Sequence, residues 1–439
     1  MASGTQASKG VPGRRGWWGF LASVGPGLIF ALSGIGARDL IVNSMAGSSD
    51  GYSLLWILVV TGAARFIILD ATARYVLVTG ETVLTGCGRI GRWAVLSWMG
   101  FWVLRQHMGA LGRAAMFGVA ANFIFPLPTP HSAAIWGFVF LTLSFILLFW
   151  GRYKWVEEVS KPLAGVMVIC LLGGVVASRP DLGDFLRGVL HPVLPSEGGR
   201  YHSGIVLMAV VSTAMGSFGN LRYSAFVHEK GWRTLDHLRS QRKDLLTGIV
   251  GGISMLAMVQ IAAAGVLGPR GIRVGRVEDL VPMFGQVLGD WGGGFFGITL
   301  LCVVFGAHVG SGSGFGIMVS DVFHRFVRPS KRMIEDGTTP GEMPAYRWLM
   351  VYLSVSPLYV FFTDWTPVGI VVATGVISVV MLPVMMVIVM LLTADRKIMG
   401  RHANGWLTNT VMIGAILCAL YLSWQGALEI IADLRGTGQ

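Results

Sequence analysis

Charged residues are scarce in this chain of 439 residues, since Asp, Glu, Lys and Arg together make up 13% of it. A typical soluble domain carries about 25%. Hydrophobic residues make up 53%. These proportions exclude a water-soluble enzyme or binding module and predict an all-α membrane protein that crosses the lipid bilayer several times.

Cysteine is also scarce, with four residues scattered along the chain. Their positions show no paired spacing, so we expect neither a disulfide framework nor a cysteine-based metal site. The start of the chain lacks the apolar core of a signal peptide and is polar and basic. We therefore interpret residues 1–17 as a cytoplasmic N-terminal tail.

Long apolar runs are what the sequence does have. Each is near or above the roughly 20 residues that a bilayer requires. We count eleven spans, at about residues 18–47, 53–78, 94–124, 133–151, 157–178, 204–228, 245–268, 292–323, 346–363, 367–392 and 407–431.

The basic residues between these spans are unevenly distributed. With the N-terminus inside, the cytoplasmic segments hold 21 of the 34 Lys and Arg residues and the outer segments hold seven. This asymmetry predicts a cytoplasmic N-terminus and an extracytoplasmic C-terminus in a plasma membrane or bacterial-type inner membrane. It also accounts for the net charge of +11 without a nucleic-acid partner.

The first and sixth spans carry matching interruptions. Gly34-Ile35-Gly36 breaks the first span, and Gly216-Ser217-Phe218-Gly219 breaks the sixth, 180 residues later. Each glycine weakens a helix by about 1 kcal/mol. Because each interrupted span opens a set of five, the second set enters the membrane from the opposite side, as in LeuT-type inverted repeats. The predicted units are the first repeat at 18–178, an extracytoplasmic loop at 179–203, the second repeat at 204–392, and an eleventh helix with the C-terminus at 393–439.

In such folds the substrate binds between the two breaks, near the middle of the membrane. Asp39 is the only carboxylate near the middle of the first span. It can bind a cation or take up a proton, or it can simply neutralise Arg38. A fixed cation within ~6 Å of a divalent metal opposes metal binding, so Arg38 must face away, pair with Asp39 or bind a substrate anion. The candidate substrate-binding residues are Ser33, Gly36, Arg38, Asp39, Thr213, Met215, Gly216, Phe218 and Gly219.

Three further side chains are candidates for proton coupling. His107 and Arg113 lie in the third span and His308 lies in the eighth. Histidine titrates nearest neutrality, although a solvated helix face or close helix packing explains these residues equally well. In the second span, Asp70 and Arg74 are four residues apart, and we expect them to form a structural ion pair.

Several motifs resemble those of the Nramp family of proton-coupled divalent-metal transporters, in order from about residue 20 to 400. The resemblance implies eleven helices and a metal site between the broken first and sixth helices. The motifs are Gly25-Pro26-Gly27, Met45-Ala46-Gly47, Gly51-Tyr52-Ser53-Leu54-Leu55-Trp56, Ala71-Thr72-Ala73-Arg74, Thr79-Gly80-Glu81, Lys154-Trp155-Val156-Glu157, Pro180-Asp181, Ser224-Ala225-Phe226-Val227, Leu382-Pro383 and Asp395-Arg396-Lys397-Ile398-Met399-Gly400.

The site residues depart from that family. Gly36-Ala37-Arg38-Asp39 stands where the family has Asp-Pro-Gly-Asn, and Gly216-Ser217-Phe218 stands where it has Met-Pro-His. The family's acidic third-helix positions align with Val103, Ala110 and Arg113. Its tenth-helix glutamine aligns with Gly375.

We therefore expect a secondary transporter, and not an enzyme, that imports a small solute by alternating access. A divalent cation is the first expectation, with a hard ion such as magnesium favoured over manganese or iron. Asp39 would be its charged ligand, assisted by backbone carbonyls near Ser33 and Thr213, and protons would be the coupling ion. The alternative is a carboxylate-bearing organic solute such as an amino acid, held by Arg38. A non-transporting sensor or scaffold is a third reading. We expect no resident cofactor; the sequence leaves the oligomeric state open, and a monomer is compatible with it.

Overall fold

The computed structural model describes residues 36–149, 165, 168–169, 171–176, 178–194, 203–216, 223–224, 227, 232, 234–327 and 343–434. Within these ranges the chain is helical and contains no strand. Five helical stretches are long and apolar enough to cross a membrane: Leu55–Thr79, Leu235–Arg270, Val277–Val327, Pro367–Ala394 and Trp406–Gly426. The predicted helical membrane fold is thus supported, whereas the count of eleven spans and the unit boundaries stay predictions.

The helices follow the predicted spans closely, with most ends displaced by a few residues. One prediction is incomplete, since the loop at 179–203 contains a helix, α8. Most of the fifth predicted span lies outside the described residues. The helices are α2 (Ala37–Asp50), α3 (Leu55–Thr79), α4 (Val83–Ile90), α5 (Arg92–Ile124), α6 (Ser132–Phe149), α8 (Leu182–Leu190), α9 (Ser203–Met215), α11 (Leu238–Val266), α12 (Val281–Leu288), α13 (Gly292–Val322), α15 (Pro344–Val355), which continues as the 3₁₀ helix η6 (Ser356–Phe362), α16 (Pro367–Ala394), α17 (Arg396–Met399) and α18 (Trp406–Leu434).

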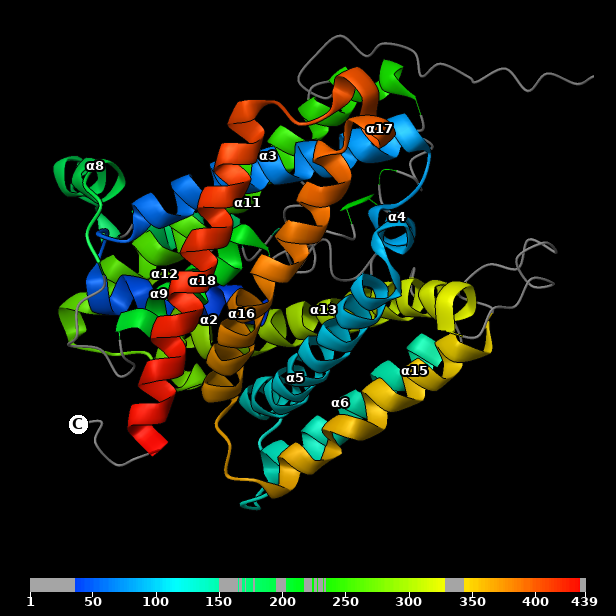
Figure 1. Ribbon diagram of the computed structural model, residues 1–439. Helices are drawn as coiled ribbons and strands as arrows, with labels where there is room; N and C mark the ends of the chain where they lie inside the picture. The colour runs from blue at the N-terminus through cyan, green and yellow to red at the C-terminus, as the bar shows by residue number, and fades with distance from the viewer. Residues whose placement is uncertain are drawn as a thin grey trace, which may run out of the picture.

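The long helices pack into two groups (Figure 1). In the first group, α2 and α3 pack against α9 and α11. In the second, α5 and α6 pack against α13 and α15. Each group takes two helices from each predicted repeat, which is the arrangement expected when two halves of a chain fold alike and interlock. Helix α16 contacts both groups, through α9 and α3 on one side and α5 on the other, and α18 packs against it.

Small residues allow the closest helix contacts within the first group. Gly47 of α2 faces α11, where an added Cβ atom would lie 2.2 Å from the carbonyl oxygen of Gln260. No side chain fits there, so glycine lets the two backbones approach. This contact gives a packing reason for the Met45-Ala46-Gly47 motif.

An ion cluster around Asp70 joins α3 to α11. The predicted pair with Arg74 is present, with Nε 3.1 Å from the Asp70 carboxylate. Arg242 of α11 adds a bidentate contact at 2.7 and 3.1 Å. Arg74 also donates to the carbonyl oxygen of His402 and to Oδ1 of Asn404, which follow α17. Through Arg74 and Arg242, the cluster around the buried Asp70 carboxylate thus links α3, α11 and the segment that follows α17.

Candidate functional site

Helix α2 begins at the break predicted for the first span. Gly36 precedes it in an extended conformation, with φ −98° and ψ 169°. The carboxylate of Asp39 accepts a hydrogen bond from the Gly36 backbone N–H at 2.9 Å. A carboxylate in the first turn also interacts favourably with the positive end of the helix dipole. Asp39 therefore stabilises the start of α2, whatever else it binds; the predicted Ser33 lies outside the described residues.

Helix α9 ends at the break predicted for the sixth span. Its last residue is Met215, which is buried, and Gly216 follows with φ +77°. This left-handed conformation favours glycine because a Cβ atom would be strained there. Space is also restricted, since a Cβ on Gly216 would lie 2.7 Å from Cζ of Arg65. The predicted Phe218 and Gly219 lie outside the described residues.

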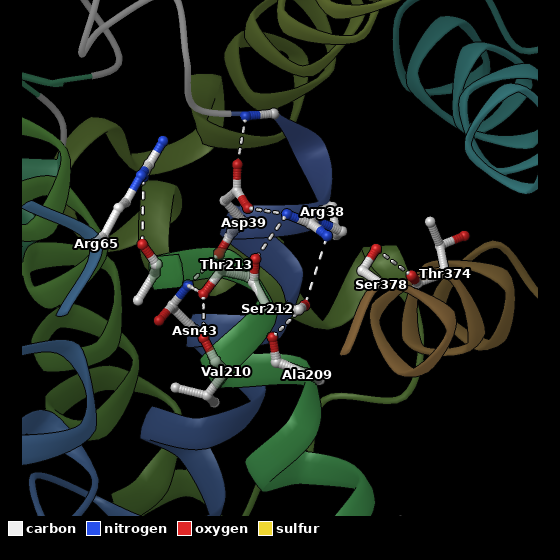
Figure 2. A network of polar contacts seen from close by, with 12 residues as sticks. Arg38, Asp39, Asn43, Arg65, Ala209, Val210, Ser212, Thr213, Thr374 and Ser378 are labelled. Carbon is white, nitrogen blue, oxygen red and sulfur yellow. Dashed lines mark hydrogen bonds and ion pairs between the residues drawn. The ribbon is translucent and has the colours of Figure 1, made fainter. Parts of the chain in front are cut away.

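The start of α2 and the end of α9 lie against each other (Figure 2). The Asn43 side chain of α2 joins them by donating to the Asp39 carbonyl oxygen at 2.8 Å and to Thr213 Oγ1 at 3.3 Å. The positive end of one helix dipole thereby meets the negative end of another. Substrates bind at this kind of meeting between half-helices in inverted-repeat transporters.

Arg38 bridges the two helix ends. Its Nη2 atom lies 3.3 Å from the Asp39 carboxylate and 3.3 Å from the Ser212 carbonyl oxygen. Its Nη1 atom lies 3.5 Å from Ser212 Oγ. Pairing with Asp39 is one of the three roles that the sequence left open for Arg38, and the structure shows that pair. Arg38 also donates to a backbone carbonyl at the end of α9.

A second guanidinium reaches the same helix end. Arg65 of α3 donates from Nη1 to the Ala214 carbonyl oxygen at 3.2 Å. In Figure 2 it lies on the opposite side of Asp39 from Arg38. Sequence reasoning did not assign Arg65 to the site, because Arg65 and Ala214 are 149 positions apart in the sequence and nothing local indicates the contact. A lone arginine at membrane depth was the available signal.

The electrostatics of this region are dominated by arginine. Arg38 is close enough to interact electrostatically with Arg65 and with Arg113 of α5. In the described part of this region, the carboxylate of Asp39 is the single negative charge opposite these three guanidinium groups. Within the described ranges, no group of three or more His, Cys, Asp or Glu side chains is placed to hold a metal ion.

Oxygen-bearing side chains nevertheless lie where the two helix ends meet. Asp39 is 8% exposed, and the buried Oδ1 of Asn43 has no hydrogen-bond partner within the described residues. Asp39 and Asn43 are four residues apart and therefore share one face of α2. Asn43 was missed in the sequence, although that spacing could have indicated it. These two residues and Thr213 form an oxygen-rich pole at the centre of the site.

The proton-coupling candidates fall into two places. His107 contacts η6, with Nδ1 3.1 Å from Ser356 Oγ and Nε2 3.1 Å from Tyr359 Oη. Arg113 and His308 are brought together, since Arg113 Nε donates to His308 Nδ1 at 3.2 Å. The proton roles of all three residues stay predictions, but only Arg113 and His308 lie near the arginine-rich region.

The comparisons with known proteins cover nearly the whole chain. A family model described as "Natural resistance-associated macrophage protein-like" matches residues 27–428. The chain belongs to the Nramp family. The match confirms the resemblance inferred from the motifs and the expectation of a transporter and not an enzyme.

Two relatives carry the name divalent metal cation transporter MntH. The protein from Chromohalobacter salexigens is 26% identical over 432 residues, covering 95% of this chain and 93% of the relative. The protein from Aeromonas hydrophila is 25% identical over 417 residues, covering 93% and 96%.

Solved structures show the same fold. The Eremococcus coleocola manganese transporter, in complex with an aromatic bis-isothiourea substituted compound, matches with a TM-score of 0.72 and 15% identity, covering 98% of this chain and 91% of that chain. A nucleobase-cation-symport-1 family transporter, Mhp1, matches with a TM-score of 0.53 and 11% identity, covering 94% and 92%. At these identities the likeness concerns the fold alone.

In this Nramp chain, Gly375 of α16 packs directly on α9. The sequence resemblance predicts that this position corresponds to the family's glutamine. A Cβ atom there would lie 3.2 Å from Ser212 Oγ and 3.3 Å from Ala209 Cα. The neighbouring helices leave little room for a larger residue at this position.

Proposed function

We propose that this Nramp protein is a secondary transporter that imports a divalent metal cation by alternating access. The observation that carries the proposal is the oxygen-rich pole of Asp39, Asn43 and Thr213 at the meeting of α2 and α9, within a chain of this family. The named relatives described as divalent metal cation transporters support the same substrate class.

The donor set favours a hard ion. Carboxylate, amide and hydroxyl oxygens suit magnesium, whereas manganese and iron also accept softer nitrogen and sulfur ligands. Magnesium usually keeps several waters and binds through one or two carboxylates. A site with one carboxylate and two neutral oxygens agrees with such a hydrated ion.

The two helix groups provide the moving parts. Alternating access in inverted-repeat transporters is largely a rocking of one bundle against the other around a fixed midplane site. Here the first group carries the oxygen-rich pole on α2 and α9, and the second group carries Arg113 and His308. Relative motion of the groups changes the distance between these charges.

A second candidate is a transporter of a carboxylate-bearing organic solute, such as an amino acid. Arg38 and Arg65 support it, because both guanidinium groups border the site and can form paired hydrogen bonds to a carboxylate. Asp39 would then hold an amine on the same solute.

Calorimetry on the purified protein distinguishes these candidates. We expect Mg²⁺ to bind, and binding to be lost in the Asp39→Asn variant. Uptake of Mg²⁺ into liposomes containing the protein then tests transport itself. Binding of amino acids in the presence of EDTA, without binding of any divalent cation, would contradict the first candidate and establish the second.

A further inference from the structure

We propose that the arginine cluster, defined as Arg38, Arg65 and Arg113, binds a carboxylate anion that accompanies the cation. The substrate is then a divalent cation complexed to a small polycarboxylate. This inference rests on the proposed function, because it adds a second component to the same site.

Charge balance is the first argument. Three guanidinium groups and one carboxylate give the region a formal charge of about +2, and a bare divalent cation would raise it to about +4, where like charges in a poorly solvated site repel strongly. A complexed di- or tricarboxylate brings two or three negative charges into the same space. The complex therefore enters a site that the bare ion is repelled from.

Unused hydrogen-bond donors are the second argument. Nε of Arg65 and Nη2 of Arg113 are buried and have no hydrogen-bond partner in the described part of the chain. Neither arginine forms an ion pair with a described carboxylate. Buried donors without acceptors are costly. Carboxylate oxygens are the acceptors that fit a guanidinium best, because they match its planar fork.

His308 extends this donor surface. It is 1% exposed, and its Nδ1 accepts from Arg113. The proton of the neutral ring must then be on Nε2. That atom is also buried and without a described partner. Three donors without a partner among the described residues thus lie on three different elements, α3, α5 and α13.

The acceptor side is complementary. Oδ1 of Asn43 is a buried acceptor without a partner among the described residues, and Asn43 lies one helical turn from Asp39. A cation satisfies these oxygens, whereas an anion satisfies the arginines. A zwitterionic amino acid also has two poles, but it brings a single carboxylate to three guanidinium groups, whereas a polycarboxylate brings two or three. The excess of arginine over carboxylate therefore favours a polyanion that carries a metal.

The test uses the full-length protein in lipid nanodiscs. Binding of ¹⁴C-labelled citrate is measured with saturating Mg²⁺ and again with EDTA, and Mg²⁺ binding is measured by calorimetry in buffer free of carboxylates. We expect citrate to bind at least tenfold more tightly with Mg²⁺ than with EDTA, and Mg²⁺ alone to bind measurably but at least tenfold more weakly than in the presence of citrate. Malate and tricarballylate extend the panel.

Each other outcome overturns the inference in a distinct way. If Mg²⁺ binds equally well with and without every carboxylate in the panel, the inference fails and the proposed function stands. If carboxylates bind equally well in EDTA, the organic-solute candidate replaces both proposals. If neither Mg²⁺ nor its complexes bind, the proposed function fails as well.

Two variants locate the anion, with a matched control. We expect Arg65→Gln and Arg38→Gln to weaken binding of the magnesium–citrate complex by at least tenfold. The control is Arg187→Gln on α8, whose side chain is 77% exposed and pairs with Asp184, and it should leave binding unchanged. Melting temperatures verify folding, and the wild-type measurements decide the matter if a variant does not fold. Unchanged citrate binding in both folded variants contradicts the assignment.

Discussion

The guanidinium of Arg38 lies 3.3 Å from the carbonyl oxygen of Ser212, although 174 residues separate the two in the chain. The contact joins the start of α2 to the end of α9. A helix C-terminus carries partial negative charge and attracts cations. In this protein a tethered guanidinium already occupies that position, beside the only carboxylate in the described part of the site. This contact is the basis of our proposal that any cation binds here beside a fixed positive charge.

Asp39→Asn should remove cation binding without unfolding the protein. The amide oxygen can still accept the hydrogen bond from the Gly36 N–H, so the cap on α2 is kept. The charge is lost, and at an effective dielectric constant of about 20 the attraction of a carboxylate for a nearby divalent cation amounts to several kcal/mol before desolvation. We expect the affinity of the protein for the Mg²⁺–polycarboxylate complex, measured by calorimetry, to fall by at least about 100-fold.

The control for that variant is Asp364→Asn, which changes an exposed carboxylate outside the site. It should bind as the wild type does. If Asp39→Asn binds and transports normally in liposomes, Asp39 is not a ligand.

Gly216→Ala should lower the melting temperature of the protein by more than the cost of placing alanine in a left-handed backbone conformation accounts for. Alanine in that conformation costs about 1–2 kcal/mol. Here its Cβ would also meet Arg65. Gly271→Ala is the matched control, because Gly271 has φ +66° and open space around it. We expect a larger fall in melting temperature for Gly216→Ala than for Gly271→Ala, and weaker anion binding only for Gly216→Ala. Equal effects would mean that Arg65 does not pack on the break.

Asp70→Asn should lower the free energy of unfolding by roughly 2–3 kcal/mol, because it leaves Arg74 and Arg242 without their shared carboxylate. The estimate is reduced because Arg242 is about half exposed and solvent screens it. Thermal unfolding in detergent measures the change. Asp184→Asn, which breaks the exposed pair with Arg187, should change stability by less than about 1 kcal/mol. A similarly small effect of Asp70→Asn would show that the cluster does not hold α3 and α11 together.

The charge asymmetry of the loops predicts that the C-terminus is extracytoplasmic. In a chain whose four native cysteines are replaced, Gly438→Cys should react with an impermeant maleimide from outside intact cells. Ser240→Cys, at the exposed start of α11, should react only after the membrane is opened. Labelling of Gly438→Cys solely from the cytoplasmic side would refute the count of eleven spans.

Local features were predictable from the sequence. Glycine and apolar runs are properties of neighbouring residues, so most bounds of the long helices, the start of α2 after Gly36, the end of α9 before Gly216 and the Asp70–Arg74 pair could be read directly. Asn43 was also accessible in principle, because it lies one helical turn from Asp39.

Contacts between distant segments were not predictable in the same way. Nothing in the sequence around Arg65 indicates that it reaches the Ala214 carbonyl, or that Arg242 shares Asp70. Arg113 and His308 were considered as separate proton groups, whereas packing of α5 against α13 makes them one pair. These contacts depend on how the two halves interlock, and a single sequence gives no measure of that.

Arg38→Gly tests most directly the central proposal that the tethered Arg38 guanidinium opposes binding of a bare divalent cation at the start of α2. Removing one positive charge at ~6 Å is worth about 2–3 kcal/mol per unit of substrate charge at an effective dielectric constant near 20, before screening and rearrangement reduce it. The measurement is calorimetric titration of Mg²⁺ into wild-type and Arg38→Gly proteins in buffer free of carboxylates, with melting temperatures recorded for both. We predict that Arg38→Gly binds Mg²⁺ at least tenfold more tightly than the wild type. A folded Arg38→Gly protein with unchanged or weaker affinity for Mg²⁺ would contradict the account.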